Sequence, residues 1–206
     1  MSKKLFALLI TLCGVGPGFA AEVPEPPLIM VFGDSLSAAW GLEQQQGWVE
    51  LLRQRLAEQG LEHRLLNASV SGETTSGGRT RLPHLLKQHR PEIVLLELGG
   101  NDGLQGHPLS LIEGNLQAMV KAIEATGGST LLVGMQIPPN FGPHYSEGFR
   151  EIFPRLANDL ELPLIPFLLA DVAGNPQCMQ EDGIHPNAAA QPQILENVWT
   201  QLSPLL

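Results

Sequence analysis

The sequence predicts one soluble α/β domain with a parallel sheet between two layers of helices. Short apolar runs with strand character recur along the chain, at 28–32, 64–70, 93–98, 130–135 and 162–167. Segments between these runs carry apolar residues at helical spacing. When strands alternate with helices, right-handed crossovers make the strands parallel and place helices on both faces of the sheet. We therefore expect a parallel sheet of about five strands.

The helical pattern is clearest in two connecting segments. The first runs from Trp48 to Leu56 and stops before Gly60, and the second runs from Leu109 to Ile123 and stops before Gly127. In both, apolar residues return every three or four positions, which indicates a helix with one buried face. The segment from Glu73 to Gly78 is polar and predicts a turn that leads to the next helix.

A last helix is expected over much of Ala188 to Leu202. Asn187 is a candidate cap because its side chain can accept a hydrogen bond from the first turn. Pro192 predicts either a kink or a late start, because proline has no backbone N–H to donate.

Residues 1–20 resemble a secretory signal peptide. Lys3 and Lys4 precede the apolar run Leu5 to Gly16, and Gly18-Phe19-Ala20 offers small residues where a signal peptidase cuts. This predicts cleavage after Ala20 and a periplasmic or secreted protein.

Two alternatives apply to the same segment. A retained membrane anchor is disfavoured because the apolar run is shorter than the roughly 20 residues of a spanning helix. A lipoprotein anchor at Cys13 is disfavoured because the preceding Leu12 is larger than such sites prefer. We therefore expect no stable membrane anchor.

Residues 21–206 are predicted to form a single domain, with no linker or repeat. Cys178 is the only cysteine of this part, so no internal disulfide and no cysteine-based metal site can form. Without Lys3 and Lys4, 10 basic residues stand against 21 acidic ones, a net charge of −11. This charge argues against nucleic acid or an anionic membrane as a partner.

Two short motifs contain the residue types of a nucleophilic hydrolase. Gly33-Asp34-Ser35-Leu36 follows the first predicted strand, and Asp182-Gly183-Ile184-His185-Pro186 lies near the end of the chain. A serine hydroxyl attacks an acyl carbonyl only when an imidazole accepts its proton, and a carboxylate must orient that imidazole. Asp182 and His185 are three positions apart, so one tight turn can bring them together.

Backbone and side-chain amides are expected beside Ser35. The carboxyl ends of parallel strands share one sheet edge, where ligands of open α/β sheets bind. Gly72 follows the second predicted strand and Asn101 follows the third. The backbone N–H groups of Ser35 and Gly72 and the Asn101 side-chain amide can then point at one developing oxyanion.

The four blocks together resemble the SGNH hydrolases of the GDSL family. They occur in order as Gly33-Asp34-Ser35-Leu36, Gly72, Gly99-x-Asn101-Asp102 and Asp182-x-x-His185. The longer strings are similar to the periplasmic acyl-CoA thioesterase I, lysophospholipase and arylesterase subgroup. Gly-x-Ser-x-Gly, the α/β-hydrolase motif, is a poorer description because Ser37 stands at the final glycine position.

The resemblance implies a fold, an activity and residue roles. The fold is a flavodoxin-like three-layer α/β/α sandwich, and the activity is hydrolysis of aryl esters, lysophospholipids and acyl-CoA through an acyl-enzyme. Ser35 is the nucleophile, His185 the base and Asp182 its orienting partner, while Ser35, Gly72 and Asn101 form the oxyanion hole. No cofactor and no metal are implied, and we expect a monomer.

The substrate groove is predicted from two loops. In the resembling subgroup, the loop that corresponds to Gly103 through Pro108 closes over acyl chains, and aromatic residues after the fourth predicted strand can either wall a groove or pack on the next helix. The candidate residues are Gly103, Leu104, Gly106, Pro108, Ile137, Phe141 and Tyr145. Two other acids, Asp34 and Asp102, are expected to brace their loops and take no part in catalysis.

Three other functions stay open at this point. A carbohydrate O-acetyl esterase would use the same three catalytic residues. A non-catalytic, flavodoxin-like nucleotide or flavin binder would use Gly99 to Gly103 as a phosphate loop. A silent binding protein would keep the hydrolase fold without reacting at Ser35.

Overall fold

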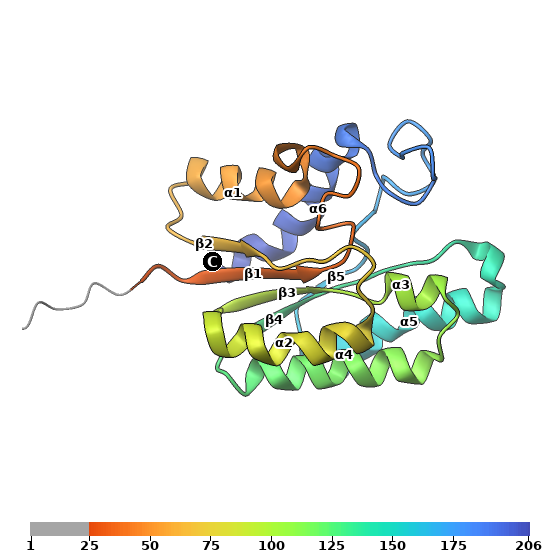
Figure 1. Cartoon of the computed structure of the whole chain (residues 1–206), viewed down its shortest axis with the longest axis horizontal. Coiled ribbons are helices and arrows are strands. Elements are labelled where there is room, and N and C mark those ends of the chain that lie inside the picture. Colours follow the sequence, from red (N-terminus) through yellow and green to blue (C-terminus); the bar gives the residue numbers. More distant parts are fainter. Residues whose placement is uncertain (1–24) are drawn as a thin grey trace, which may run out of the picture.

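The computed structural model describes residues 25–206, which are built around one five-stranded parallel sheet (Figure 1). The predicted signal peptide, residues 1–20, lies outside the described residues. The strands are β1 (Leu28–Gly33), β2 (Arg64–Asn67), β3 (Ile93–Glu97), β4 (Ser129–Val133) and β5 (Leu164–Ile165). Their spatial order is β2-β1-β3-β4-β5, and every neighbouring pair is parallel.

Helices cover both faces of the sheet (Figure 1). On one face α1 (Trp48–Glu58) packs against α6 (Gln191–Leu202). On the other face α4 (Leu109–Glu124) packs between α2 (Thr75–His89) and α5 (Pro143–Asp159). The predicted three-layer α/β/α sandwich is therefore confirmed.

Short helical turns complete the chain. α3 (Gly100–Leu104) directly follows β3 and its connecting Gly99. Single 3₁₀ turns lie at η1 (Gln44–Gln46), η2 (Pro139–Phe141), η3 (Ala188–Ala190) and η4 (Ser203–Leu205). No helix of the described residues has the length and apolarity that a membrane span requires.

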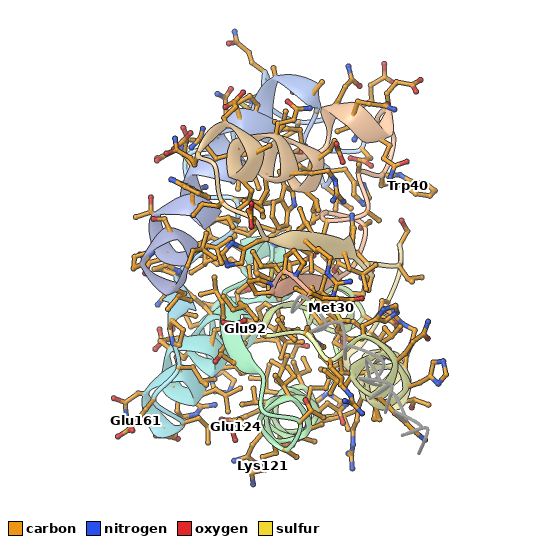
Figure 2. All side chains as sticks on the ribbon, turned by 90° about the vertical axis from the view of Figure 1, so that its left-hand side faces the viewer. Met30, Trp40, Glu92, Lys121, Glu124 and Glu161 are labelled. Atoms are coloured by element: carbon orange, nitrogen blue, oxygen red, sulfur yellow. The ribbon has the colours of Figure 1, made fainter. Side chains whose placement is uncertain are left out.

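The core lies on both sides of the central strands. β1 and β3 are buried along their whole length, as expected for parallel strands covered by helices on two faces. Figure 2 shows Met30 in the interior, while Lys121, Glu124 and Glu161 point outward at the periphery. The helix face predicted from Trp48 to Leu56 is buried at Trp48, Leu52 and Leu56.

Two strands are much shorter than the sequence predicts, and β3 and β4 also end early, at Glu97 and Val133. β2 ends at Asn67 and not at Val70, although Ala68 N and Val70 N still donate to Val31 O (2.8 Å) and Gly33 O (3.0 Å) of β1. The Asn67 side chain donates to Ser37 O (2.8 Å) and accepts from Ser69 N (3.1 Å). β5 pairs over only two residues. Pro163 and Pro166 flank it, and proline has no N–H for the ladder.

Two helix starts also differ from the prediction. α2 begins at Thr75, inside the segment expected to be a turn, because the Thr74 side chain accepts a hydrogen bond from Gly77 N (3.2 Å). Asn187 does act as a cap, but for η3, and α6 starts at Gln191. Pro192 therefore marks a late start and not a kink.

Gly134 is the position where the sheet requires glycine most strictly. It follows β4, and a Cβ at this residue would meet the carbonyl oxygens of Ile165, the last residue of β5, and of Pro166 directly after it. We expect Gly134→Ala to lower the free energy of unfolding by about 2 kcal/mol, because backbone atoms cannot yield as a flexible side chain can. Urea unfolding followed by circular dichroism measures the change.

Gly114→Ala is the matched control. Gly114 is exposed within α4, and a Cβ there meets nothing within 4 Å. Alanine is favoured over glycine inside a helix, so this variant should gain about 0.5–1 kcal/mol. Equal effects of the two substitutions would contradict the close approach at Gly134.

Candidate active site

The candidate site lies at the carboxyl ends of β1 and β3, where the strand order changes direction. Successive strands are laid down on one side of β1 and then on the other, and such a switch point leaves a crevice at the sheet edge. Ser35 follows β1 and Asn101 follows β3, the adjacent strand. Gly72 follows β2 on the other side of β1.

Ser35 sits at the start of a compact turn. Ala38 N donates to Asp34 O (2.9 Å) and Trp40 N donates to Ser35 O (3.1 Å). The Asp34 carboxylate caps the same turn by accepting from Leu36 N (3.0 Å). The side chain of Ser35 is thereby held at the open end of the sheet, where it lines a groove.

The two distant motifs meet in one hydrogen-bonded chain. His185 Nε2 lies 2.9 Å from Ser35 Oγ, and His185 Nδ1 lies 2.6 Å from Asp182 Oδ2. The other oxygen, Asp182 Oδ1, accepts from Ile184 N and His185 N, each at 2.9 Å. The spacing of three residues therefore closes one tight turn, as the sequence predicts.

The turn keeps Asp182 ionised. The hydrogen bonds from His185 N, from the His185 side chain and from Ile184 N lower the pKa of the Asp182 carboxyl to about 2. An ionised carboxylate orients the imidazole and stabilises it when it takes up a proton.

Two of the three predicted oxyanion donors make no hydrogen bond to the described part of the protein. Among the described residues, the N–H groups of Ser35 and Gly72 donate to no protein acceptor. Gly72 has φ +78°, a conformation that L side chains rarely adopt, so the backbone after β2 requires glycine here. Both amides are therefore available to an oxygen that develops negative charge.

Asn101 is held differently. Its Nδ2 group already donates to Asp34 Oδ2 (3.0 Å) and to Glu73 O (2.9 Å). An amide nitrogen has only two hydrogens. To bind Asn101 Nδ2, an oxyanion must therefore share one of them with Asp34 Oδ2 or Glu73 O, or displace that acceptor. The side chain is fixed in place by the same bonds.

A buried carboxyl group that was not predicted from the sequence lies beneath the turn that begins at Ser35, which we call the nucleophile turn. Glu97, the last residue of β3, is 0% exposed and its Oε2 accepts from Asp34 N (3.1 Å) and Ser37 Oγ (2.6 Å). The signal in the sequence is a single acidic residue at the end of the apolar run Ile93-Val94-Leu95-Leu96.

Burial changes the protonation of both acids under the turn. Desolvation, together with the nearby Asp34 charge, raises the pKa of Glu97 well above its usual value. Desolvation also raises the pKa of Asp34 to about 6, against the hydrogen bond from Leu36 N. Burial therefore favours the protonated form of both acids more than a position at the surface would.

Asp102 braces its loop as predicted from the sequence. It is buried, and its two oxygens accept from Thr75 N (2.8 Å) and Thr75 Oγ1 (2.6 Å). The carboxylate thereby joins α3 to the start of α2.

A groove of about 650 Å³ begins at Ser35 and runs toward β5; we call it the acyl groove. Its wall is mostly apolar and comes from segments that follow β1, β3, β4 and β5. The apolar side chains of this wall are Leu36, Leu104, Met135, Ile137, Pro138, Pro139, Phe167, Leu169, Ala173, Met179 and Ile184.

Of the seven residues predicted for the groove, Leu104 and Ile137 line its wall. Gly103, Gly106, Pro108, Phe141 and Tyr145 do not line it.

Packing explains where these residues lie. A Cβ on Gly103 would meet Ile137 and Phe149, and the Tyr145 hydroxyl donates to His107 O (2.7 Å). Phe141 packs half-buried against the core. Phe141 at the end of η2 and Tyr145 in the first turn of α5 therefore pack outside the groove.

Most of the far wall was missed. Phe167, Leu169, Met179 and Ile184 belong to the long segment after β5, and their place at the carboxyl edge could have indicated the wall. In the described part of the chain, no group of three or more His, Cys, Asp and Glu side chains is arranged to hold a metal ion.

Comparison with known proteins gives the family. Residues 31–191 match the model of the GDSL-like lipase/acylhydrolase family. The chain belongs to this family.

This GDSL-like protein is similar to characterised enzymes over most of its length. It is 49% identical to esterase TesA of Pseudomonas aeruginosa, over 86% of this chain and 89% of that protein. It is 40% identical to an arylesterase of Vibrio mimicus, over 97% of each chain. It is 42% identical to thioesterase 1/protease 1/lysophospholipase L1 of Escherichia coli, over 98% of this chain and 91% of that protein.

A solved structure agrees with the fold. The psychrotrophic esterase EstA from Pseudoalteromonas, inhibited by monoethylphosphonate, superposes with a TM-score of 0.83 at 42% identity. The match covers 86% of this chain and 97% of that one.

The acids beneath the turn give the GDSL-like domain a pH-dependent stability. Because the pKa of Glu97 is raised in the folded state, the unfolded chain releases this proton first as pH rises above about 4.5. The unfolded state then binds fewer protons, so the free energy of unfolding falls with rising pH. Glu97→Gln removes this titration and should flatten the fall by about 1 kcal/mol or more between pH 4.5 and 8.

Urea unfolding at several pH values measures the effect. The control is Glu151→Gln, because Glu151 is exposed and pairs only with its neighbour Arg150. A Glu97→Gln variant with the same pH slope as the unsubstituted protein would show that Glu97 is ionised in the folded state.

Proposed function

We propose that this chain hydrolyses carboxylic esters and acyl thioesters through an acyl-enzyme formed on Ser35. The observation that supports it most directly is the chain of contacts from Asp182 through His185 to Ser35 Oγ, at 2.6 and 2.9 Å. The similar proteins are named as an esterase, an arylesterase and a thioesterase/lysophospholipase, which supports the same bond types here.

The first half of the reaction forms the acyl-enzyme. Ser35 Oγ attacks the acyl carbonyl carbon while His185 Nε2 takes the hydroxyl proton, and the Asp182 carboxylate stabilises the imidazolium. The carbonyl oxygen becomes an oxyanion that the N–H groups of Ser35 and Gly72 stabilise, and Asn101 Nδ2 is the third donor. His185 then gives its proton to the departing alkoxide or thiolate, and the acyl group stays on Ser35.

The second half returns the enzyme. His185 Nε2 takes a proton from water, the hydroxide attacks the acyl-enzyme carbonyl, and the same donors hold the second oxyanion. The proton on His185 goes to Ser35 Oγ as the ester bond breaks. The carboxylic acid leaves, and no redox step or cofactor enters the balance.

The apolar wall of the groove favours acyl chains as substrates. Its wall is mostly apolar and offers few polar partners to a polysaccharide, which an O-acetyl esterase would have to bind. The loop considered as a phosphate loop, 99–103, forms the start of α3, and Asn101 there contacts the Asp34 carboxyl group. A carboxylate at that point disfavours a nucleotide phosphate.

Removal of the reacting groups tests the mechanism. We expect Ser35→Ala and His185→Ala to lower kcat for p-nitrophenyl octanoate by about 10⁴-fold or more, because neither a nucleophile nor a base replaces them. Ser110→Ala, an exposed serine at the start of α4 and outside the groove, is the control and should keep full activity. Nitrophenol release at the normal rate from Ser35→Ala would disprove the mechanism.

We also propose that residues 1–20 direct export to the periplasm. Support comes from Lys3 and Lys4, the apolar run Leu5 to Gly16 and the small residues Gly18 and Ala20. The protein recovered from the periplasm of a Gram-negative host should begin at Ala21 by intact mass. Ala20→Gln should accumulate uncut, because the peptidase accepts only a small residue there; an uncut, membrane-bound unsubstituted protein would contradict export.

A further inference from the structure

A second cavity lies on the other side of the nucleophile turn. It has a volume of about 290 Å³, and we call it the β2-side cavity. It is lined by Ser37, Ala38, Ala39, Leu42, Gln44, Gly47, Val49, Glu50, Arg53, Asn67 and Ser69. These residues belong to the turn after β1, to the first half of α1 and to the end of β2.

The two cavities extend in opposite directions from β1. The acyl groove is built from segments after β1, β3, β4 and β5, whereas the β2-side cavity uses segments after β1 and β2. β2 and β3 are the two neighbours of β1 in the sheet (Figure 1). The turn that begins at Ser35 therefore separates the cavities and contributes residues to both.

The acyl chain and the alcohol or thiol half of an ester extend from the carbonyl carbon in different directions. The inference rests on the proposed function: when Ser35 is acylated, the acyl chain occupies the apolar groove, and the alcohol or thiol half departs elsewhere. The β2-side cavity lies on the other side of the turn. Its wall includes the Gln44 side chain, whereas the polar groups of Ser37, Asn67 and Ser69 already bond within the protein.

Arg53 indicates what kind of leaving group this cavity suits. Its Nε donates to Glu50 Oε2 at 3.0 Å, and among the described residues its Nη groups have no protein acceptor. A guanidinium has five N–H donors in a planar fork that matches two phosphate oxygens. The side chain is 47% exposed, so it can turn toward a ligand without loss of a buried contact.

The net negative charge of the chain bears on the role of Arg53. The chain has a net charge of −9, which repels anionic ligands in general. Arg53 is a cation in the wall of this cavity, and Glu50, which lines the same cavity, pairs with it, so a phosphate has to compete with that carboxylate.

We propose that the β2-side cavity binds the leaving group of substrates whose alcohol or thiol bears a phosphate, and that Arg53 contacts that phosphate. Lysophospholipids and acyl-CoA share this chemistry. Glu50 competes with the phosphate for the guanidinium.

Matched substrate pairs test the proposal on the full-length mature protein. Octanoyl lysophosphatidylcholine is compared with 1-octanoylglycerol, and octanoyl-CoA is compared with the octanoyl thioester of N-acetylcysteamine. The measured quantity is the ratio of kcat/KM between the phosphorylated and the phosphate-free member of each pair. Arg53→Gln should lower this ratio about fivefold, the size of one partly exposed charge-assisted contact.

Two further variants fix the cause. Glu50→Gln should raise the same ratio, because the guanidinium loses its competing carboxylate. Arg155→Gln is the matched control and should leave the ratio unchanged: Arg155 also pairs with a carboxylate, Glu113 at 2.8 Å, and is 48% exposed, but it lies on α5 outside both cavities. Added salt should reduce the Arg53 effect by screening it.

The outcomes distinguish the two kinds of phosphorylated leaving group, and they distinguish failure of the Arg53 role from failure of the proposed esterase function. A fall confined to the lysophospholipid pair assigns the cavity to glycerophosphate leaving groups, and a fall confined to the thioester pair assigns it to CoA. Equal losses within each pair, or no loss, would overturn the role of Arg53 while the proposed esterase function stands. If the unsubstituted protein hydrolyses none of the four substrates, the proposed function itself fails and the inference falls with it.

Discussion

The catalytic arrangement depends on one buried carboxyl group at the junction of β1 and β3. Glu97 Oε2 accepts from Asp34 N and Ser37 Oγ, on either side of Ser35, so the end of β3 holds the turn that presents the nucleophile. Asp34 in turn holds the Asn101 amide. Burial this complete is costly for an ion, and this desolvation, together with the nearby Asp34 charge, raises the pKa of Glu97.

The catalytic site is assembled from one local contact and one long-range contact. Asp182 and His185 need only a tight turn, but their approach to Ser35 needs the whole sheet, because 150 residues separate the serine from the histidine. Gln180 strengthens that approach: its Nε2 donates to Trp40 O (2.8 Å) and Pro186 O (3.0 Å), so it joins the nucleophile turn to the histidine turn. Trp40 is 54% exposed beside His185 and points away from the fold (Figure 2).

The sequence predicted what depends on type and spacing, and missed what depends on packing. Apolar runs and helical periodicity were enough for the sheet, and Asp182-x-x-His185 was enough for its turn. The groove was less predictable, because Phe141 and Tyr145 follow β4 at the same edge of the sheet but pack outside the groove. Glu97 was hidden inside an apolar strand, and the double bonding of Asn101 depends on a rotamer that no spacing specifies.

The central claim is that an acyl group is attached to Ser35 during turnover. Protein mixed rapidly with p-nitrophenyl octanoate, quenched in acid and digested can be mapped by mass spectrometry for an added octanoyl group. The account predicts a transient octanoyl adduct on the peptide that contains Ser35, which disappears as free octanoate accumulates. An adduct on a different residue, or turnover with no adduct at any time, would contradict it.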